Sequence, residues 1–370
     1  MSYAAPSLIK FPNLPELPLQ GEEMMGQPKE LRRGNRRKVI QLLFDQHNWN
    51  EGRLTRPQLA ELTGLSKVTV NAIVQELQDA GLLELARQEG DRGALGRVPQ
   101  GIQLKRECGT VLAGDVQRGR IAFRVSAMTG HETSEHSLPC SQQQLLQALQ
   151  QYIREVSVSK PFGPLRQVVL ALPAPVSADG QVGEPNAVRE LDTRQLQNWS
   201  HTNEIALTFE NDANLAAFAA AELFPDDPYL AALIERRSGT GLGLILDDQL
   251  YRGMSGKAGE LGRSPWPTLH GSEVLEQLPD DERLRATTYL LASLAQTLDL
   301  QLLVLGLPES RAHALAAALT PLLPPSIRLN LVEDVDRLTL DGASRRAMQL
   351  ARSQFIDEVS MRAGGEPHVA

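Results

Sequence analysis

Aromatic residues, cysteines and long apolar runs are all scarce in this chain of 370 residues. Aromatic side chains make up only 4% of the sequence, which argues against a carbohydrate site built on stacked rings and favours one built on hydrogen bonds. The two cysteines, Cys108 and Cys140, fit neither a disulfide framework nor a zinc cluster. No run of about 18 apolar residues occurs, and the first residues do not read as a secretory signal, so we expect a cytoplasmic protein without a membrane span.

Charge is spread unevenly along the chain. The formal net charge is −8, which taken alone argues against binding nucleic acid. Residues 30–106, however, hold 13 Lys and Arg against 9 Asp and Glu, whereas residues 107–370 hold 22 against 33. The first part therefore carries +4 and the second −11. A basic part joined to an acidic body predicts that only the first part contacts DNA.

Residues 31–106 are predicted to form a winged helix-turn-helix domain. Thr55 can cap a short helix, and Ser66 can cap a second helix over residues 67–77. Two strand-like stretches follow and flank a glycine-rich tip, which indicates a hairpin wing. Residues 1–30 are rich in proline and are predicted to be a flexible arm in front of this domain.

The start of the second helix carries polar side chains that suit DNA. A helix fits the major groove and presents its first residues to the base edges. Asn71 offers the paired donor and acceptor that adenine accepts, and Lys67 can neutralise a phosphate. Arginines of an earlier helical stretch, residues 35–44, and of the wing tip can do the same. The predicted DNA-binding residues are Arg36, Arg37, Ser66, Lys67, Thr69, Asn71, Arg92 and Arg97.

From residue 107 onward, apolar runs typical of buried strands alternate with helical segments. The strand-like runs include residues 111–116, 168–172 and 302–305. Helical patterns cover residues 142–156, 213–223, 283–300 and 308–322. This alternation predicts an α/β domain in residues 107–370.

Four stretches of this region stand in a recognisable order. Residues 172–176 read Leu-Pro-Ala-Pro-Val, residues 210–214 read Glu-Asn-Asp-Ala-Asn, residues 239–243 read Gly-Thr-Gly-Leu-Gly, and residues 256–262 read Gly-Lys-Ala-Gly-Glu-Leu-Gly. In this order they resemble the ROK family (repressors, open reading frames and kinases). The N-terminal module resembles that of the family's repressor branch, which includes xylose and N-acetylglucosamine repressors.

The resemblance covers about residues 31–355 and implies a fold for the whole chain. Behind the winged helix-turn-helix it implies the two-lobed actin-like or ribonuclease-H-like fold of sugar kinases. Lobe one would comprise about residues 107–212 together with a C-terminal helix over residues 341–360. Lobe two would comprise about residues 213–340.

The same resemblance implies a ligand site between the lobes. Asp212 matches the residue that acts as general base in family kinases, where a carboxylate takes a proton or accepts a hydrogen bond. Asn186, Asn211 and Glu260 match residues that hold the sugar, and together they supply both donors and acceptors. The predicted ligand-binding residues are Asn186, Asn211, Asp212, Glu260 and Arg263.

Three departures from the family pattern change what the site is expected to do. Gln117 and Arg118 stand where family kinases have the small residues of a phosphate loop, which predicts that phosphoryl transfer is lost. Residues 264–268 contain no cysteine, so no thiolate zinc site is expected there. Arg263 stands where the family has a histidine, and it either binds an anionic ligand such as a sugar phosphate or forms a salt bridge with Glu260. We therefore expect no catalytic residue, no metal and no cofactor.

Together these observations predict a sequence-specific transcription regulator and favour a repressor. Its expected partners are a double-stranded DNA operator with an inverted repeat, a small carbohydrate effector, and further copies of the chain in a homodimer or larger homo-oligomer. Two alternatives stay open. One is an active sugar kinase with an attached DNA-binding domain, and the other is a regulator whose sensor has lost ligand binding and only dimerises.

Overall fold

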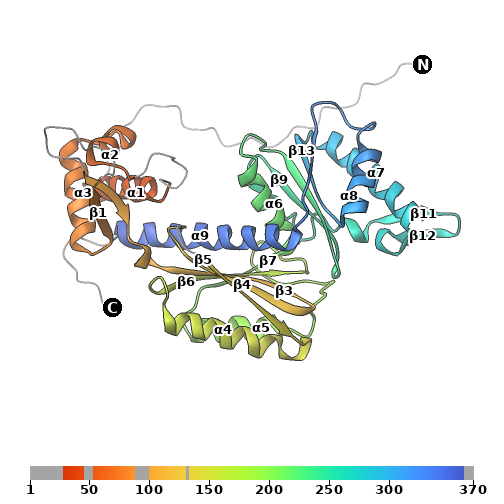
Figure 1. Ribbon diagram of the computed structural model, residues 1–370, viewed down its shortest axis with the longest axis horizontal. Coiled ribbons are helices and arrows are strands. Elements are labelled where there is room, and N and C mark those ends of the chain that lie inside the picture. Colours follow the sequence, from red (N-terminus) through yellow and green to blue (C-terminus); the bar gives the residue numbers. More distant parts are fainter. Residues whose placement is uncertain (1–27, 46–52, 88–99, 131–132, 362–370) are drawn as a thin grey trace, which may run out of the picture.

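The computed structural model describes residues 28–45, 53–87, 100–130 and 133–361. A small N-terminal domain lies at one end of the molecule, followed by two mixed sheets that each have their own helices (Figure 1). One long helix, α9 (Val335–Met361), runs from the second sheet to the N-terminal domain (Figure 1). None of the helices in the described residues has the length and apolar character that crossing a membrane requires.

The N-terminal domain is a winged helix-turn-helix, as the sequence predicts. It contains α1 (Pro28–Asp45), α2 (Arg56–Thr63), α3 (Lys67–Asp79) and the antiparallel strands β1 (Leu83–Arg87) and β2 (Gln100–Leu104). Before α2, the backbone N–H of Thr55 donates to Gln58 Oε1 at 2.9 Å, and after it Gly64 adopts the left-handed conformation that lets the chain turn. Aliphatic side chains form a fully buried core: Val39, Ile40, Leu59, Val70, Val74 and Ile102.

The first helix starts earlier than the sequence suggests. α1 begins at Pro28, so residues 28–30, assigned to the flexible arm, are helical. Proline is favoured at the first helical position, because its φ is already helical and an N–H there would have no partner. The rest of the predicted arm, and the wing tip with Arg92 and Arg97, lie outside the described residues.

The first sheet has the strand order β5-β4-β3-β6-β7. β3 (Thr110–Gln117), β4 (Gly119–Ala127) and β5 (Thr133–Cys140) are antiparallel neighbours, whereas β6 (Leu165–Leu172) and β7 (Leu207–Asn211) continue parallel to β3. α4 (Leu145–Ser159) and α5 (Thr193–Thr202) cover one face, and α9 lies on the other (Figure 1). Both faces are therefore covered, which explains the nearly continuous apolar runs of β3 and β6.

The second sheet repeats this topology with the order β10-β9-β8-β13-β14. β8 (Leu230–Arg236), β9 (Gly239–Leu246) and β10 (Gln249–Leu250) are antiparallel neighbours, and β13 (Leu302–Gly306) and β14 (Arg328–Leu331) continue parallel to β8. α6 (Asp212–Leu223) packs on β8 and β9, and α7 (Asp280–Thr297) and α8 (Glu309–Leu319) share a core with the sheet. A small hairpin of β11 (Pro265–Thr268) and β12 (Gly271–Val274) projects from this part (Figure 1). The two sheets confirm the two-lobed α/β fold, while the boundaries at residues 30, 106, 212 and 340 stay predictions.

Helix α9 is longer than the C-terminal helix expected over residues 341–360. It begins at Val335 because Asp334 caps it: the Asp334 carboxylate accepts the backbone N–H of Arg337 at 2.9 Å. The helix packs on β3 and β6 of the first sheet and on α6. Its extra turn brings its start to the space between the two lobes.

The C-terminal part of α9 holds the N-terminal domain. The rings of Phe44 in α1 and Phe355 in α9 meet edge to face with their centroids 5.8 Å apart, and the Arg352 guanidinium lies 5.2 Å from the Phe44 ring centroid. Arg37 and Asp357 add an ion pair. Because the buried cores of the two parts are continuous, a movement of α9 is expected to reach α1.

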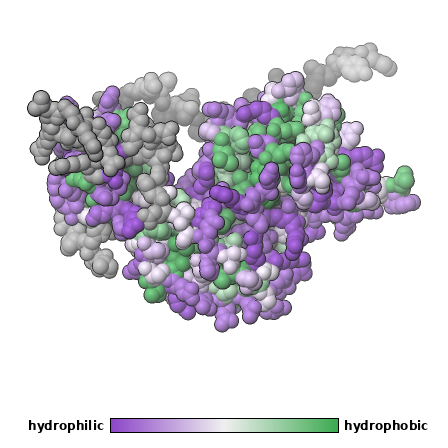
Figure 2. Space-filling model, in the orientation of Figure 1, coloured by the Kyte–Doolittle hydropathy of each residue, from purple (hydrophilic) through white to green (hydrophobic). Residues whose placement is uncertain are grey.

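Hydrophilic side chains cover most of the face seen in Figure 2, and apolar side chains gather over α6 and the second sheet. Exposed large apolar residues near these elements include Leu223 at the end of α6 and, after β10, Tyr251 and Met254. An exposed apolar group of this kind is typical of a surface that contacts another protein chain.

Candidate functional site

The first two turns of α3 form an exposed polar face. Lys67 and Asn71 are exposed, and Val68 between them is 79% exposed. Ser66 caps the helix, because its Oγ accepts the backbone N–H of Thr69 at 3.1 Å and lies 2.9 Å from the Thr69 hydroxyl. The opposite stripe of the helix is buried in the domain core, so this face is the one available to a partner.

The two arginines predicted on α1 form ion pairs within the protein. Arg36 Nη2 lies 2.6 Å from Glu76 Oε2 of α3, and Arg37 pairs with Asp357 of α9. Each arginine would therefore share its charge between a carboxylate and a DNA phosphate. Their role in DNA binding stays a prediction, as does that of the wing arginines, which lie outside the described residues.

The five predicted ligand residues are brought together around one cavity of about 120 Å³, here called the inner pocket. They come from the segment before α5, from the β7–α6 junction and from the loop after β10, so the pocket lies between the two lobes. The residues that line it are Arg118, Pro173, Ala174, Pro185, Asn186, Ala187, Arg189, Asn211, Asp212, Ile234, Ser238, Gly239, Thr240, Gly241, Glu260, Arg263 and Glu276.

The two asparagines differ in how much hydrogen-bonding capacity they keep for a ligand. Asn211 caps α6: its Oδ1 accepts the Asn214 N–H at 3.0 Å, and its Nδ2 donates to Ala174 O at 3.0 Å. Asn186 Oδ1 accepts the Val188 N–H at 2.8 Å, but its Nδ2 donates to none of the described residues. Asn186 therefore keeps a donor for a ligand hydroxyl, whereas Asn211 mainly shapes the corner.

An ion pair and a close backbone approach hold the loop that carries Glu260. Arg252 Nε donates to Glu210 Oε2 at 2.9 Å, and Glu210 is 3% exposed. Gly259, at φ 82°, passes so close to β9 that an added Cβ would lie 1.7 Å from Leu242 O. Only glycine fits there, so backbone packing explains this part of the motif independently of any ligand.

Glu260 and Arg263 line the same pocket but do not form the salt bridge that the sequence left open. Among the described residues, neither side chain has an ion-pair partner. Burial raises the pKa of the Glu260 carboxyl, the nearby Asp212 raises it further, and the charge of Arg263 lowers it. Whether Arg263 binds an anionic ligand stays a prediction.

Asp212 is enclosed by a polar network that reaches across the two lobes. It is 6% exposed, and Arg236 Nη1 lies 3.5 Å from its Oδ2 and 2.8 Å from Asp115 Oδ1. Gln117 Nε2 donates to Asp212 at 3.2 Å and to Asp115 at 3.1 Å. Burial raises the pKa of Asp212, and Arg236 opposes that shift. One cation of the chain, Arg236, thus lies between these two carboxylates.

A carboxylate of the chain also lies against Gly239 and Thr240 at the start of β9. Glu276 Oε1 accepts the backbone N–H of Thr240 at 2.6 Å. It packs so closely against Gly262 that an added Cβ there would lie 2.2 Å from Oε1. A backbone N–H group at the end of a glycine-rich strand can bind an anion, and here the anion is Glu276.

The sequence does not single out Arg236 or Glu276. Arg236 has a local signal, since Arg236 and Arg237 follow a buried apolar run shortly before the Gly-Thr-Gly stretch. Glu276 has no local signal, because its hydrogen-bond partner, Thr240, lies 36 positions away in the chain. Gln117, which stands where family kinases have a small residue, donates hydrogen bonds to two carboxylates, Asp115 and Asp212.

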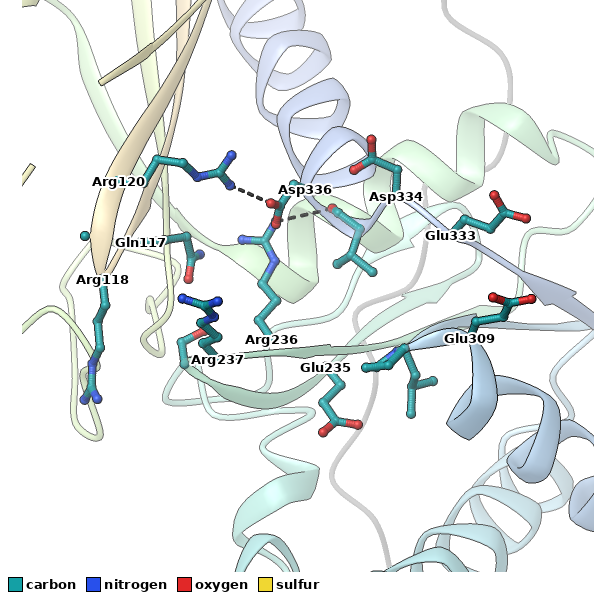
Figure 3. A pocket seen from close by; sticks show the side chains of 15 residues that line it. Gln117, Arg118, Arg120, Glu235, Arg236, Arg237, Glu309, Glu333, Asp334 and Asp336 are labelled. Atoms are coloured by element: carbon teal, nitrogen blue, oxygen red, sulfur yellow. Dashed lines mark hydrogen bonds and ion pairs between the residues drawn. The ribbon is translucent and has the colours of Figure 1, made fainter. Parts of the chain in front are cut away.

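A larger cleft of about 820 Å³, here called the outer cleft, adjoins the inner pocket and shares Arg118 and Ser238 with it. Arginines of the β3–β4 turn lie on one side and carboxylates at the starts of α8 and α9 on the other (Figure 3). Asp336 of α9 joins them: its Oδ2 lies 2.6 Å from Arg120 Nη2, and its Oδ1 lies 3.2 Å from Arg236 Nη2. The residues that line this cleft are Gln117, Arg118, Gly119, Arg120, Glu235, Arg236, Arg237, Ser238, Leu307, Pro308, Glu309, Glu333, Asp334, Val335 and Asp336.

Neither metal binding nor thiol chemistry is indicated by the described residues. In that part of the chain, no group of three or more His, Cys, Asp and Glu side chains is arranged to hold a metal ion. Cys108 and Cys140 are buried free thiols, and burial raises the pKa of Cys108 to about 12. A buried thiol with a raised pKa is a poor nucleophile and a poor metal ligand.

Two stretches of the chain match known families. Residues 50–92 match the MarR family model, and residues 113–272 match the ROK family model. The xylose repressor of Staphylococcus xylosus is 21% identical to this chain over 237 residues, which are 62% of this chain and 60% of the repressor. The match thus spans less than two thirds of that relative's length.

Solved structures share the fold. The crystal structure of a ROK family transcriptional regulator, a homologue of the Escherichia coli Mlc protein, has a TM-score of 0.60 at 15% identity, with 90% of this chain and 98% of that chain covered. The ROK hexokinase of Thermus thermophilus has a TM-score of 0.52 at 22% identity, with 65% of this chain and 98% of that chain covered. The chain therefore contains a stretch, residues 113–272, that matches the ROK family, preceded by a stretch, residues 50–92, that matches a MarR-type helix-turn-helix.

Proposed function

We propose that this chain is a DNA-binding transcription regulator of the repressor type whose ROK domain responds to a carbohydrate. The observation that carries the proposal is helix α9, which runs from the outer cleft, next to the inner pocket, to the N-terminal domain. At its start Asp336 Oδ1 lies 3.2 Å from Arg236 Nη2, and near its end Phe355 packs against Phe44 of α1. The likeness to a xylose repressor supports the same function.

The proposed mechanism is a change in the position of α9 when a ligand fills the inner pocket. The Arg236 guanidinium contacts both Asp212, which lines the pocket, and Asp336, which lies in the first turn of α9. A ligand that hydrogen-bonds to Asp212 changes the electrostatic attraction between Asp212 and Arg236. The lobes then adopt a different arrangement, and α9 moves α1 with it. The ligand acts in this way only when it binds one arrangement of the lobes more tightly than the other.

The operator is proposed to be an inverted repeat bound by a homodimer. A two-fold dimer presents two copies of α3 related by its axis, so the half-sites lie a whole number of turns apart, each of about 10 base pairs. The exposed apolar residues near α6 and β10 are candidates for the contact between copies. Because such a regulator acts where the chromosome is, the proposal includes a cytoplasmic location.

A second candidate function, a sugar kinase with an attached DNA-binding domain, is motivated by the fold shared with the Thermus hexokinase. Phosphoryl transfer depends on positioned phosphates and on cations that neutralise them. In this chain Arg236 lies between two buried carboxylates, and Glu276 accepts a hydrogen bond from the backbone N–H of Thr240. We propose that these two side chains leave no place for a nucleotide phosphate, so that the domain is a sensor and not an enzyme.

The DNA-binding half of the proposal is tested with duplexes that the full chain selects from a random library. Affinity should fall steeply with salt, with a log–log slope of about −0.9 per phosphate contact. Lys67→Ala should weaken all duplexes alike and reduce the slope by about one contact. Asn71→Ala should lose about 1–3 kcal/mol on the selected duplex and little on others, because a bidentate contact to one base is removed. Fluorescence anisotropy over a salt series measures both effects.

Asn198→Ala is the matched control, because Asn198 is an exposed asparagine on α5, outside the N-terminal domain. It should bind every duplex as the parent chain does. A library from which no duplex is enriched would contradict the proposal, and an unchanged base preference in the Asn71 variant would remove Asn71 from the base-contacting residues. Intact DNA binding without a response to any carbohydrate would favour a ROK domain that only dimerises.

A further inference from the structure

Val68 is a branched apolar side chain that lies exposed at the start of α3. It is 79% exposed, whereas the other valines that the structure describes in the N-terminal domain, Val39, Val70 and Val74, are fully buried. Valine is also a weaker helix former than alanine, lysine or glutamine. Neither the packing of the domain nor the stability of the helix therefore accounts for a valine at this position.

The hydroxyl groups beside Val68 are engaged within the helix start. Ser66 Oγ accepts the backbone N–H of Thr69 at 3.1 Å and lies 2.9 Å from Thr69 Oγ1. Lys67 and Asn71 are exposed, and neither makes an ion pair or a side-chain hydrogen bond with the described residues. Lys67, Val68 and Asn71 are therefore the side chains that the first two turns of α3 offer to a partner.

The later turns of α3 carry two carboxylates on their exposed side. Glu76 forms an ion pair with Arg36 at 2.6 Å, and Asp79 accepts a hydrogen bond from Gln75 at 2.8 Å. Carboxylates are repelled by DNA phosphates, whereas the N-terminus of a helix attracts them. The end of α3 that carries Val68 is thus the end that approaches the base edges, as in other helix-turn-helix domains.

Val68 belongs to a small apolar surface on this approaching face. Ala72 follows it by four residues and is also exposed, so the two side chains are neighbours on the helix, with Asn71 beside them. Among the groups that base pairs present in the major groove, the C5 methyl of thymine is the apolar one. A valine side chain forms no hydrogen bond, so this methyl group is the feature of a base edge that it fits.

We propose that Val68 contacts the C5 methyl group of one thymine in each half-site and selects thymine at that position. This inference rests on the proposed function and names a residue that determines its DNA specificity. The contact removes apolar surface of both groups from water. The other bases present hydrogen-bonding groups, which Val68 would cover without replacing the hydrogen bonds that they make with water.

Deoxyuridine in place of thymidine tests the contact, because its base pairs in the same way and lacks only the C5 methyl group. The parent duplex is one that the full chain selects from a random library, and each of its thymines is replaced in turn in both half-sites. At one position, deoxyuridine should weaken binding about fourfold for each half-site, which corresponds to one buried methyl group. Fluorescence anisotropy at constant salt measures the change.

Val68→Ala completes a double-mutant cycle between the protein and the DNA. The variant should bind the parent duplex about fourfold more weakly for each half-site and should no longer distinguish thymine from deoxyuridine at that position. The salt dependence of its binding should equal that of the parent chain, because no charge is removed. Alanine is the better helix former, so α3 is expected to keep its structure in this variant.

Val158→Ala is the matched control. Val158 is 76% exposed on α4, outside the N-terminal domain. The control variant should bind the thymine and deoxyuridine duplexes as the parent chain does.

Three results would overturn the inference. A selected duplex in which no thymine can be replaced by deoxyuridine with a loss of affinity would exclude the methyl contact and leave the proposed function intact. A preference for thymine over deoxyuridine that persists in Val68→Ala would assign the methyl group to another residue. A library from which no duplex is enriched would contradict the proposed function itself and this inference with it.

Discussion

The inner pocket and the outer cleft adjoin each other between the same two lobes, yet they use their charged groups differently. In the outer cleft, Arg120 and Arg236 are bound to carboxylates of the chain, with Asp336 at 2.6 and 3.2 Å. In the inner pocket, Arg263 and Glu260 have no such partner among the described residues. Charges paired within the protein hold its parts together, whereas unpaired charges beside a cavity are available to a ligand. The ion pairs of the outer cleft therefore join the lobes, and the inner pocket is the place proposed for the effector.

We expect the largest effect on the free energy of unfolding when Arg236, which forms ion pairs with carboxylates of the chain, is replaced. Its side chain, 5% exposed, lies between Asp115 and Asp212, which are almost fully buried. Arg236→Ala leaves these carboxylates without their cation, and removal of one partner of a buried pair lowers the free energy of unfolding by about 3–5 kcal/mol. Urea denaturation at neutral pH measures the loss.

Arg237→Ala is the control for this measurement. Arg237 is the next residue in the chain, but it is exposed and has no ion pair with the described residues. Its replacement should change the free energy of unfolding by no more than about 0.5 kcal/mol. Equal stability of the two variants would show that Arg236 is not the cation on which Asp115 and Asp212 depend.

The DNA-binding domain and the inner pocket could be predicted because their signals are local or ordered along the chain. Thr55 and Ser66 stand directly before helical stretches, and capping residues mark a helix start to within a few positions. Asn186, Asn211 and Glu260 stand in stretches with a family order, and the structure brings all three to one cavity.

Contacts between distant parts of the chain could not be predicted. Arg37 pairs with Asp357, which lies 320 residues away in the chain. Arg236 at the end of β8 pairs with Asp336 in the first turn of α9. Such pairs depend on how the lobes and the N-terminal domain pack, and no local pattern marks which carboxylate an arginine meets. The charged network that separates the outer cleft from the inner pocket is therefore visible only in the structure.

We expect a smaller effect on the free energy of unfolding when Glu260, which has no ion pair with the described residues, is replaced. Burial raises the pKa of this carboxyl above the usual value of 4.5. A carboxyl whose pKa is raised on folding contributes stability that is present below the unfolded pKa and is lost as the pH rises through the folded pKa. Glu260→Gln removes this titration, so the variant should gain stability relative to the parent chain as the pH rises above the usual pKa of 4.5, by less than about 1 kcal/mol.

Urea denaturation of both chains at several pH values in this range measures the difference. The gap in the free energy of unfolding should widen in favour of the glutamine variant as the pH rises. A gap that stays constant would show that Glu260 titrates at its ordinary value, and a gap that closes would show that its carboxylate is stabilised by partners within the fold.

We claim that Arg236 and Glu276 close the site to nucleotide phosphates. Titration of the full chain with magnesium ATP, with and without glucose, N-acetylglucosamine or xylose, tests this claim most directly. We predict no saturable binding of ATP in the millimolar range and no formation of ADP, because the chain's own groups already occupy the cation and anion positions. Saturable ATP binding together with sugar-dependent formation of ADP, lost in Asp212→Asn, would contradict this claim and establish the chain as a kinase.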